Sequence, residues 1–228
     1  MASKMLRRSG VAVGLVAELL GWKAEVIWQV GVGLYYEEID VLKQEWNLDK
    51  ENIIGFEANP ITFGRIVDHY PGTLMNVALS DFVGRGELSF DPRHKDGSTL
   101  KGLNHGKTSE NVEVTKLDAV PCKTTGQKIL LWLDCEGSEL DVLRGGVEFL
   151  KHVDVVNVEI TGKPPGDGWC APVDVYLWLR EHGFRLQHIH TQRTSAGQFD
   201  AVFVRSELWK EEYCCCFHEL LEERRNIK

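Results

Sequence analysis

The sequence has no excess of positive charge and no apolar run long enough to cross a bilayer. Its 228 residues include 26 Lys and Arg against 34 Asp and Glu, which gives a formal net charge of −8. A protein that grips nucleic acid through its phosphates needs a basic face, so nucleic acid is disfavoured as a partner. No segment approaches the ~18 apolar residues that a membrane-spanning helix requires, so we expect no membrane span.

The N-terminal segment lacks the marks of a signal peptide. Residues 5–20 carry two arginines and then an apolar stretch, but Glu18 interrupts that stretch. No convincing cleavage site of small residues precedes the first expected strand. We therefore expect an amphipathic helix, within residues 1–24, that packs on a sheet.

The cysteines form neither a disulfide framework nor a zinc site. They are Cys122, Cys135, Cys170, Cys214, Cys215 and Cys216. No C-x-x-C pair occurs, and three adjacent cysteines cannot build a regular disulfide ladder. The pattern predicts free thiols in a reducing compartment, and hence a cytoplasmic protein.

Strand-like and helix-like segments alternate from about residue 22 onward. Strands are expected at residues 25–30, 52–57, 74–79, 87–90, 112–120, 129–133, 153–160, 184–190 and 201–205. Helices are expected at residues 35–46, 61–70, 138–150, 172–182 and in the tail 206–228, and the polar stretch 91–110 is expected to be a long loop. This alternation indicates an α/β fold with a mostly parallel sheet covered on both faces. Because no repeat or linker interrupts it, we expect one domain over residues 1–228.

Three features near the first strands favour a nucleoside ligand. Gly31 and Gly33 follow the first strand, where glycine lets the backbone approach a ligand closely. A dinucleotide fingerprint would place a third glycine where Tyr36 stands, so a nicotinamide cofactor is disfavoured. Glu57, at the end of the second strand, can accept hydrogen bonds from a ribose diol, or it is simply a solvated strand-end charge. Asp81, after the third strand, either accepts from an adenine amino group or caps the next turn.

Four segments in the same order resemble the FkbM family of S-adenosylmethionine-dependent methyltransferases. They are residues 56–60 (FEANP), 76–84 (NVALSDFVG), 117–118 (LD) and 133–145 (LDCEGSELDVLRG). The similarity extends from about residue 25 to residue 205. It implies a Rossmann-like class I methyltransferase fold, with seven strands of which the last is antiparallel, and an extra strand pair after the third strand. It also implies S-adenosylmethionine as cofactor and, because the family is similar to sugar and polyketide O-methyltransferases, a hydroxyl acceptor on a small molecule or carbohydrate.

The resemblance assigns cofactor contacts to particular positions. The Gly31 and Gly33 loop would face the methionine end, Glu57 the ribose and Asp81 the adenine, with Ala58 and Ser80 beside these carboxylates. The family usually has an acidic residue before its first glycine loop, where this chain has Gln29. The Gln29 amide can still hydrogen-bond the cofactor, but it supplies no negative charge for the ammonium group. This departure leaves one alternative function, a weak or inactive cofactor-binding protein that acts as a partner subunit.

Carboxylates after the fourth and fifth strands are the candidates for catalysis. Methyl transfer needs the acceptor, methyl and sulfur in line, and a hydroxyl acceptor must also lose a proton. We expect Asp134 to contact the cofactor and to orient the acceptor or act as base, with Glu136 second and Glu159 within reach of the same crevice. A helix that starts near Gly137 is expected to lower the pKa of a nearby carboxylate. The alternative is that Asp134 and Glu136 only cap this helix, with Glu139 completing the cap.

Three further residues are candidates for acceptor binding. His188 and His190 alternate on the sixth strand of the main sheet and therefore share a face. A metal pair is the alternative, but without a nearby third ligand we expect no metal. Trp169, in the loop after the fifth strand, either stacks on the acceptor or packs in the core or on the surface.

Overall fold

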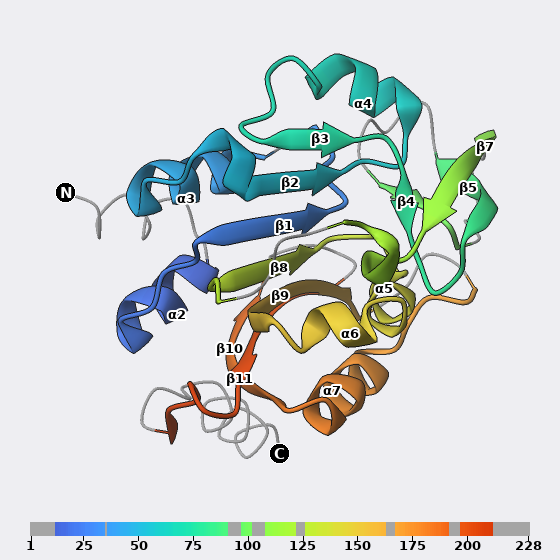
Figure 1. The fold of residues 1–228 in the computed structure, drawn as a ribbon. Helices are drawn as coiled ribbons and strands as arrows, with labels where there is room; N and C mark the ends of the chain where they lie inside the picture. The colour runs from blue at the N-terminus through green and yellow to red at the C-terminus, as the bar shows by residue number, and fades with distance from the viewer. Residues whose placement is uncertain are drawn as a thin grey trace.

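The computed structural model describes residues 12–34, 36–90, 97–101, 108–121, 126–162, 167–191 and 197–211. Its centre is a seven-stranded sheet in the order β10-β11-β9-β8-β1-β2-β3 (Figure 1). The strands are β1 Val26–Val30, β2 Ile53–Phe56, β3 Thr73–Met75, β8 Ile129–Leu133, β9 Val153–Thr161, β10 Phe184–Thr191 and β11 Gln198–Arg205. Only β11 runs antiparallel to its neighbours, so the predicted sheet with an antiparallel last strand is confirmed.

Helices cover both faces of this sheet. They are α2 Ala12–Leu20, α3 Glu37–Trp46, α4 Pro60–Ile66, α5 Glu139–Arg144, α6 Val147–Leu150 and α7 Pro172–Glu181, with short 3₁₀ turns at η1 Lys50–Asn52 and η2 Leu117–Ala119. On one face α2, α3 and the end of α4 pack against alternate strand residues such as Ile27 and Leu130. On the other face α5, α6 and α7 pack against the intervening residues such as Trp28.

Trp28 shows how the second of these layers is held. Its ring centroid lies 4.4 Å from that of Phe149 on α6 and 5.4 Å from that of Phe56 on β2. All three side chains are buried, and each contributes about 1.5–3 kcal/mol through removal of apolar surface from water. This packing fixes α6 on the face of the sheet that β1 and β2 form.

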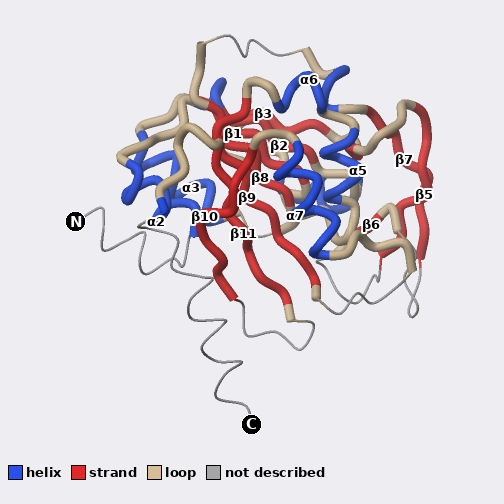
Figure 2. The backbone as a smooth tube through the Cα atoms, turned by 90° about the horizontal axis from the view of Figure 1, so that it is seen from below, coloured by secondary structure: helices blue, strands red, loops and turns tan. Residues whose placement is uncertain are grey.

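A second, four-stranded sheet follows β3, and it contains the expected extra strand pair. Its strands are β4 Ala78–Leu79, β5 Gly84–Phe90, β6 Ser98–Thr99 and β7 Thr108–Thr115, in the order β4-β7-β5-β6. Strands β5 and β7 form a long antiparallel pair, and Figure 2 shows them at one side of the molecule, beyond α5.

Three predictions in this region need correction. The expected strand 74–79 is divided between the two sheets, because the Asn76 side-chain amide donates to the Glu57 carbonyl oxygen at 2.7 Å and holds the chain at the crossing point. The expected loop 91–110 contains β6 and the start of β7, while residues 91–96 and 102–107 lie outside the described part. The strand expected to continue to residue 120 ends at Thr115, before η2.

The single helix expected at 138–150 is also wrong, because it is divided into α5 and α6 at Gly145 and Gly146. A Cβ on Gly145 would lie 2.0 Å from the Ser80 carbonyl oxygen, and one on Gly146 would lie 2.7 Å from the Leu117 side chain. Glycine allows this close packing but favours the helix less than other residues do. The Asp118 carboxylate then caps α6 by accepting the N–H groups of Glu148 and Phe149 at 3.2 and 2.7 Å.

The ends of the described chain are only partly as expected. Helix α2 packs on β10 and β11, which confirms an N-terminal helix on the sheet over residues 12–20. Residues 206–210 form a turn and irregular structure instead of a helix, and the rest of the expected tail, residues 212–228, lies outside the described residues. Across the described ranges, no helix combines the length and the apolar character that crossing a membrane would require.

Candidate active site

A cleft opens at the carboxyl ends of β1, β2 and β8, where open α/β sheets bind their ligands. Its empty volume, including the part open to solvent, is about 840 Å³. The walls come from the loop after β1, the end of β2, the segment 77–79, the small sheet and the turn after β8. The candidate residues Gly31, Gly33, Glu57, Ala58, Asp134 and Glu136 all line it. The sequence therefore located the cleft from residues that are far apart along the chain.

The loop after β1 needs glycine, as predicted. Gly31 and Gly33 have φ angles of +76° and +64°, in the left-handed region that favours glycine. A Cβ on Gly31 would lie 1.7 Å from the Asp134 carbonyl oxygen. Gly31 therefore packs closely against the turn that follows β8. This contact joins two walls of the cleft.

Glu57 is buried at the base of the cleft, so the alternative of a solvated strand-end charge is wrong. Only 5% of the residue is exposed. One carboxylate oxygen accepts the Gly33 N–H and the other accepts the Asn59 N–H, both at 2.8 Å. Burial raises the pKa of Glu57, and these N–H donors oppose the rise by stabilising the charged form. A carboxylate oxygen can accept two hydrogen bonds, so Glu57 retains acceptor capacity towards a ligand.

Asn59 connects Glu57 to the small sheet. Its side-chain oxygen caps α4 by accepting the Ile61 N–H at 2.9 Å, and its amide nitrogen donates to the Ser98 hydroxyl at 2.9 Å. Ser98 itself lines the cleft on β6. The FEANP segment therefore positions the base of the cleft, the start of α4 and the small sheet together.

Three residues expected at the cofactor do not line the cleft: Gln29, Ser80 and Asp81. Gln29 lies inside β1, on the face covered by α3, and its side-chain oxygen accepts the Tyr70 hydroxyl at 2.9 Å. Ser80 is buried, while Asp81 is exposed. The Ser80 hydroxyl is within 3.4 Å of an Asp81 carboxylate oxygen. The predicted cofactor contacts of these three residues stay predictions.

Apolar residues form a further part of the cleft wall. Val77 and Leu79 line the cleft from the end of the crossing segment, and Leu88 and Leu100 line it from the small sheet. Sequence reasoning missed all four because they look like ordinary strand residues. Their common signal, apolar side chains beside the FEANP and NVALSD segments, becomes meaningful only once the small sheet is placed over the cleft.

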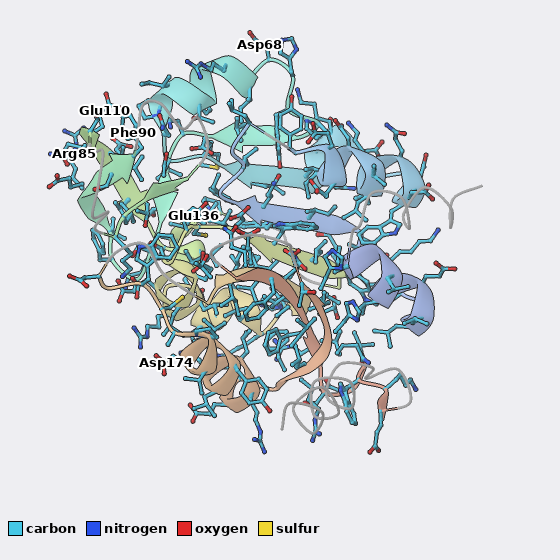
Figure 3. The ribbon with its side chains drawn as sticks, turned by 180° about the vertical axis from the view of Figure 1, so that it is seen from behind. Asp68, Arg85, Phe90, Glu110, Glu136 and Asp174 are labelled. Atoms are coloured by element: carbon cyan, nitrogen blue, oxygen red, sulfur yellow. The ribbon has the colours of Figure 1, made fainter. Side chains whose placement is uncertain are left out.

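The turn of residues 134–137, which we call the acidic turn, gathers the predicted catalytic carboxylates. One carboxylate oxygen from each of Asp134, Glu136 and Glu159 lies within 4.8 Å of the other two. Glu136 lies between the small sheet, which carries Arg85, Phe90 and Glu110, and the central strands (Figure 3). Its φ of +49° is left-handed for a non-glycine residue, which costs about 1 kcal/mol or more.

The pKa of Asp134 is shifted in the direction opposite to the one expected from the helix N-terminus. Burial raises the pKa of Asp134 well above its usual range, and the charges of Glu159 and Glu136 raise it further. Burial and like charges therefore outweigh the helix dipole. A carboxyl with a raised pKa is the better proton acceptor for an alcohol.

A carboxylate closes the turn at the start of α5. Glu139 fills that role, because one of its carboxylate oxygens accepts the N–H groups of Cys135 and Gly137 at 2.9 and 3.0 Å. Thus the capping alternative holds for Glu139, and the other two carboxylates belong to the cleft.

Comparison with known proteins identifies the family of this chain. Residues 31–186 match the model of the methyltransferase FkbM domain. The chain belongs to the FkbM methyltransferase family. A relative is the hexuronic acid methyltransferase AglP of Haloferax volcanii, which is 28% identical over 204 residues covering 71% of this chain and 81% of that protein.

Solved structures with a similar fold are more distant. Magnesium protoporphyrin IX methyltransferase of Synechocystis is 11% identical, with a TM-score of 0.47 over 84% of this chain and 78% of that one. A SAM-dependent methyltransferase of Aquifex aeolicus is 12% identical, with a TM-score of 0.45 over 90% of this chain and 98% of that one. Both similarities are too weak to bear on the substrate.

The cleft of this FkbM methyltransferase fits S-adenosylmethionine. It joins a buried carboxylate at Glu57, an apolar wall at Leu79 and an acidic end at Asp134. Ser138 also lines it and is only 3% exposed, and its hydroxyl oxygen has no hydrogen-bond partner among the described residues. A buried hydroxyl without a partner is costly, and a polar ligand group would satisfy it. No separate sequence signal marks Ser138, which resembles an ordinary helix cap.

Glu159 and the two candidate histidines lie beyond the acidic turn. Glu159 on β9 is directly opposite Asp200 on β11, and Asp200 is directly opposite His190 on β10. Directly opposed residues share a sheet face, so these three side chains form one row. Burial lowers the pKa of half-buried His188, and the charge of His190 lowers it further. Asp200, which sequence reasoning missed, is recognisable only from this strand register.

Trp169 packs beneath the acidic turn. A Cβ on Gly137 would lie 2.3 Å from the indole ring of Trp169, and the buried indole nitrogen has no partner in the part of the chain that the structure describes. The Cys170 N–H donates to the Gly137 carbonyl oxygen at 3.1 Å. Of the alternatives for Trp169, the structure therefore supports the packing role. Cys170 and Cys135 are free thiols, as expected, while Cys122 and Cys214–Cys216 lie outside the described residues.

Proposed function

We propose that this chain transfers the methyl group of S-adenosylmethionine to a hydroxyl of a carbohydrate or a similar small polyhydroxylated acceptor. The observation that carries the proposal is one continuous cleft that both Glu57 and Asp134 line. The similarity to a hexuronic acid methyltransferase supports a carbohydrate acceptor.

The chain's own groups supply the contacts that the cofactor requires. Glu57 accepts the ribose hydroxyls, while the apolar side chains of Leu79, Leu88 and Leu100 cover the adenine ring. The left-handed loop at Gly31 and Gly33 leaves its backbone open towards the methionine end. The unpartnered Ser138 hydroxyl hydrogen-bonds the same part of the ligand.

When bound, S-adenosylmethionine supplies an electrophilic methyl group on a sulfonium. The protein aligns the acceptor hydroxyl with that group and removes the hydroxyl proton. Asp134 takes the proton, because burial and neighbouring charges give its carboxyl a raised pKa. Glu136 and Glu159, whose oxygens lie within 4.8 Å of one another and of Asp134, orient the acceptor by accepting hydrogen bonds.

The acceptor lies next to the row formed by Glu159, Asp200 and His190. His188 and His190 contact it from β10, the strand beyond β11. A cytoplasmic location is part of the same proposal, and the free thiols of Cys135 and Cys170 support it.

The acidic turn favours catalysis over binding alone. Gathering three carboxylates and placing Glu136 at a φ of +49° both cost free energy. A protein that only held the cofactor would gain nothing from this arrangement. A strained, like-charged turn beside the methionine end is useful where a proton has to move.

Calorimetry and turnover test the proposal together. The protein is titrated with S-adenosylmethionine, and formation of S-adenosylhomocysteine is then followed with uronic acids, neutral hexoses and amino sugars as acceptors. We expect saturable cofactor binding and turnover with at least one of these sugars. No binding at millimolar cofactor, or binding without turnover on any acceptor, would overturn the proposed activity.

A further inference from the structure

Glu139 is a buried carboxylate that lies behind the acidic turn and outside the lining of the cleft. It is 2% exposed. One oxygen accepts the N–H groups of Cys135 and Gly137, and the other accepts the Cys170 thiol at 3.2 Å. Burial raises the pKa of Cys170 to about 12, and the neighbouring charge of Glu139 adds to the rise, so the thiol stays protonated and donates. Three donors from two segments therefore converge on one side chain.

The turn that Glu139 holds does not adopt its conformation easily. Glu136 and Gly137 have consecutive left-handed φ angles of +49° and +93°. Without a partner for the N–H groups of Cys135 and Gly137, these buried donors would lose hydrogen bonds that water cannot replace. Glu139 supplies that partner from the first turn of α5.

Other segments restrain the same turn from different sides. Thr99 on β6 donates to the Glu136 carbonyl oxygen at 2.6 Å, and Trp169 packs on Gly137. Gly31 lies directly against the Asp134 carbonyl oxygen. Glu139 differs from these restraints because it is also charged and is close enough to act on Asp134.

We propose that Glu139 is a positioning residue for methyl transfer, which holds the acidic turn so that Asp134 faces the cleft and whose negative charge makes the Asp134 carboxylate a stronger base. This inference rests on the proposed function, because it assigns Asp134 the role of base. It adds a residue that touches neither the cofactor cleft nor the acceptor.

The charge effect follows from the groups that face Asp134. They are Glu136 in the same turn, Glu159 on β9, Asp200 on β11 and Glu139 on α5, and all four raise the pKa of Asp134 in addition to burial. The hydrogen bonds from Cys170, Gly137 and Cys135 stabilise the charged form of Glu139 and oppose the effect of its burial. Removal of the Glu139 charge therefore lowers the pKa of Asp134 and weakens it as a base.

Two substitutions separate geometry from charge. Glu139→Gln keeps an oxygen for the N–H groups of Cys135 and Gly137 but removes the charge. Glu139→Ala removes both. Glu148→Gln is the matched control, because Glu148 is exposed on α6 and its carboxylate pairs with Lys151 at 2.6 Å, away from the turn.

We expect the low-pH limb of the kcat profile of Glu139→Gln to move down by about one pH unit, with kcat reduced and the KM for cofactor unchanged. Glu139→Ala should lower kcat about 100-fold, as expected when a positioned base is lost. Glu148→Gln should match the wild type in all three quantities. An unmoved low-pH limb in Glu139→Gln, or an unchanged kcat in Glu139→Ala, would overturn the inference.

A direct titration tests the charge effect without any acceptor. The protein is labelled with ¹³C-aspartate, and the carboxyl signal of Asp134 is assigned by its absence in Asp134→Asn. In Glu139→Gln this signal should titrate at lower pH than in the wild type, and equal titration would contradict the inference. This readout remains valid if no acceptor is methylated, so failure of the inference and failure of the proposed function are distinguishable.

Discussion

The Glu57 carboxylate accepts the backbone N–H of Gly33 across 2.8 Å, and this bond joins the ends of two adjacent parallel strands. It fixes the glycine loop relative to the base of the cleft, while Gly31 fixes the same loop against Asp134. The two ends of the proposed cofactor site are therefore connected by a few residues of backbone. A substitution of Glu57 should therefore lower the affinity for the cofactor more than it lowers the rate of methyl transfer.

Glu57→Gln should weaken binding of S-adenosylmethionine by about 1–3 kcal/mol, because hydrogen bonds to a charged acceptor are lost. The amide nitrogen would also face the N–H of Gly33 or Asn59, both of which now donate to the carboxylate. Isothermal titration calorimetry measures the change, and circular dichroism checks that the fold is kept. An affinity equal to that of the wild type would remove Glu57 from the binding site.

Asp81→Asn should leave the affinity for S-adenosylmethionine within about twofold of the wild type, since a side chain outside the cleft makes no contact to lose. Asp81 is exposed and does not line the cleft, although the family resemblance places it at the adenine. The same calorimetric titration provides the comparison. A tenfold loss of affinity would indicate that Asp81 does contact the adenine.

Asp134→Asn should abolish most turnover and yet stabilise the fold above neutral pH. The pKa of Asp134 is raised in the folded protein, so its contribution to stability is present at low pH and is lost as the pH rises through the folded value. The neutral amide avoids this loss, so the variant should have the higher Tm at high pH.

Thermal unfolding of Asp134→Asn and wild type at pH 4 and pH 8 tests the sign. We expect a higher Tm for the variant at pH 8 and nearly equal values at pH 4. A variant that is less stable at pH 8 would show that the Asp134 carboxylate is favoured, rather than disfavoured, by its surroundings.

Asp118→Ala should reduce the stability of the protein by about 1 kcal/mol through loss of the α6 cap. Its carboxylate accepts the N–H groups of Glu148 and Phe149, and it does not line the cleft. Denaturant unfolding measures the loss, and the affinity for S-adenosylmethionine is the control. Weaker cofactor binding with unchanged stability would reverse this assignment.

The sequence predicted most strands because their apolar runs end at glycine, proline or asparagine. It also predicted that Glu57 and Asp134 lie together, since parallel strands present their carboxyl ends at one edge. It did not predict the division of the third strand, because the contact between Asn76 and the Glu57 carbonyl oxygen is made across the two sheets. The break between α5 and α6 at Gly145 was not predicted for a similar reason. Glycine is required there because the Ser80 carbonyl oxygen, which is distant in sequence, lies against it.

The sequence predicted the site residues whose location depends on backbone position alone. It missed those whose role depends on the direction of the side chain. Gln29 is next to the glycine loop in sequence but lies on the face of β1 that Tyr70 covers. Ser138 looks like a helix cap, yet its hydroxyl has no partner and it lines the cleft. The row formed by Glu159, Asp200 and His190 depends on strand register, which no local pattern gives.

The most direct test of the central claim is a crystal structure of the protein with S-adenosylhomocysteine. The account predicts the ribose hydroxyls within hydrogen-bonding distance of the Glu57 carboxylate, and the sulfur directed towards Asp134 and the acidic turn. A nucleoside bound elsewhere, or one whose ribose makes no contact with Glu57, would contradict it.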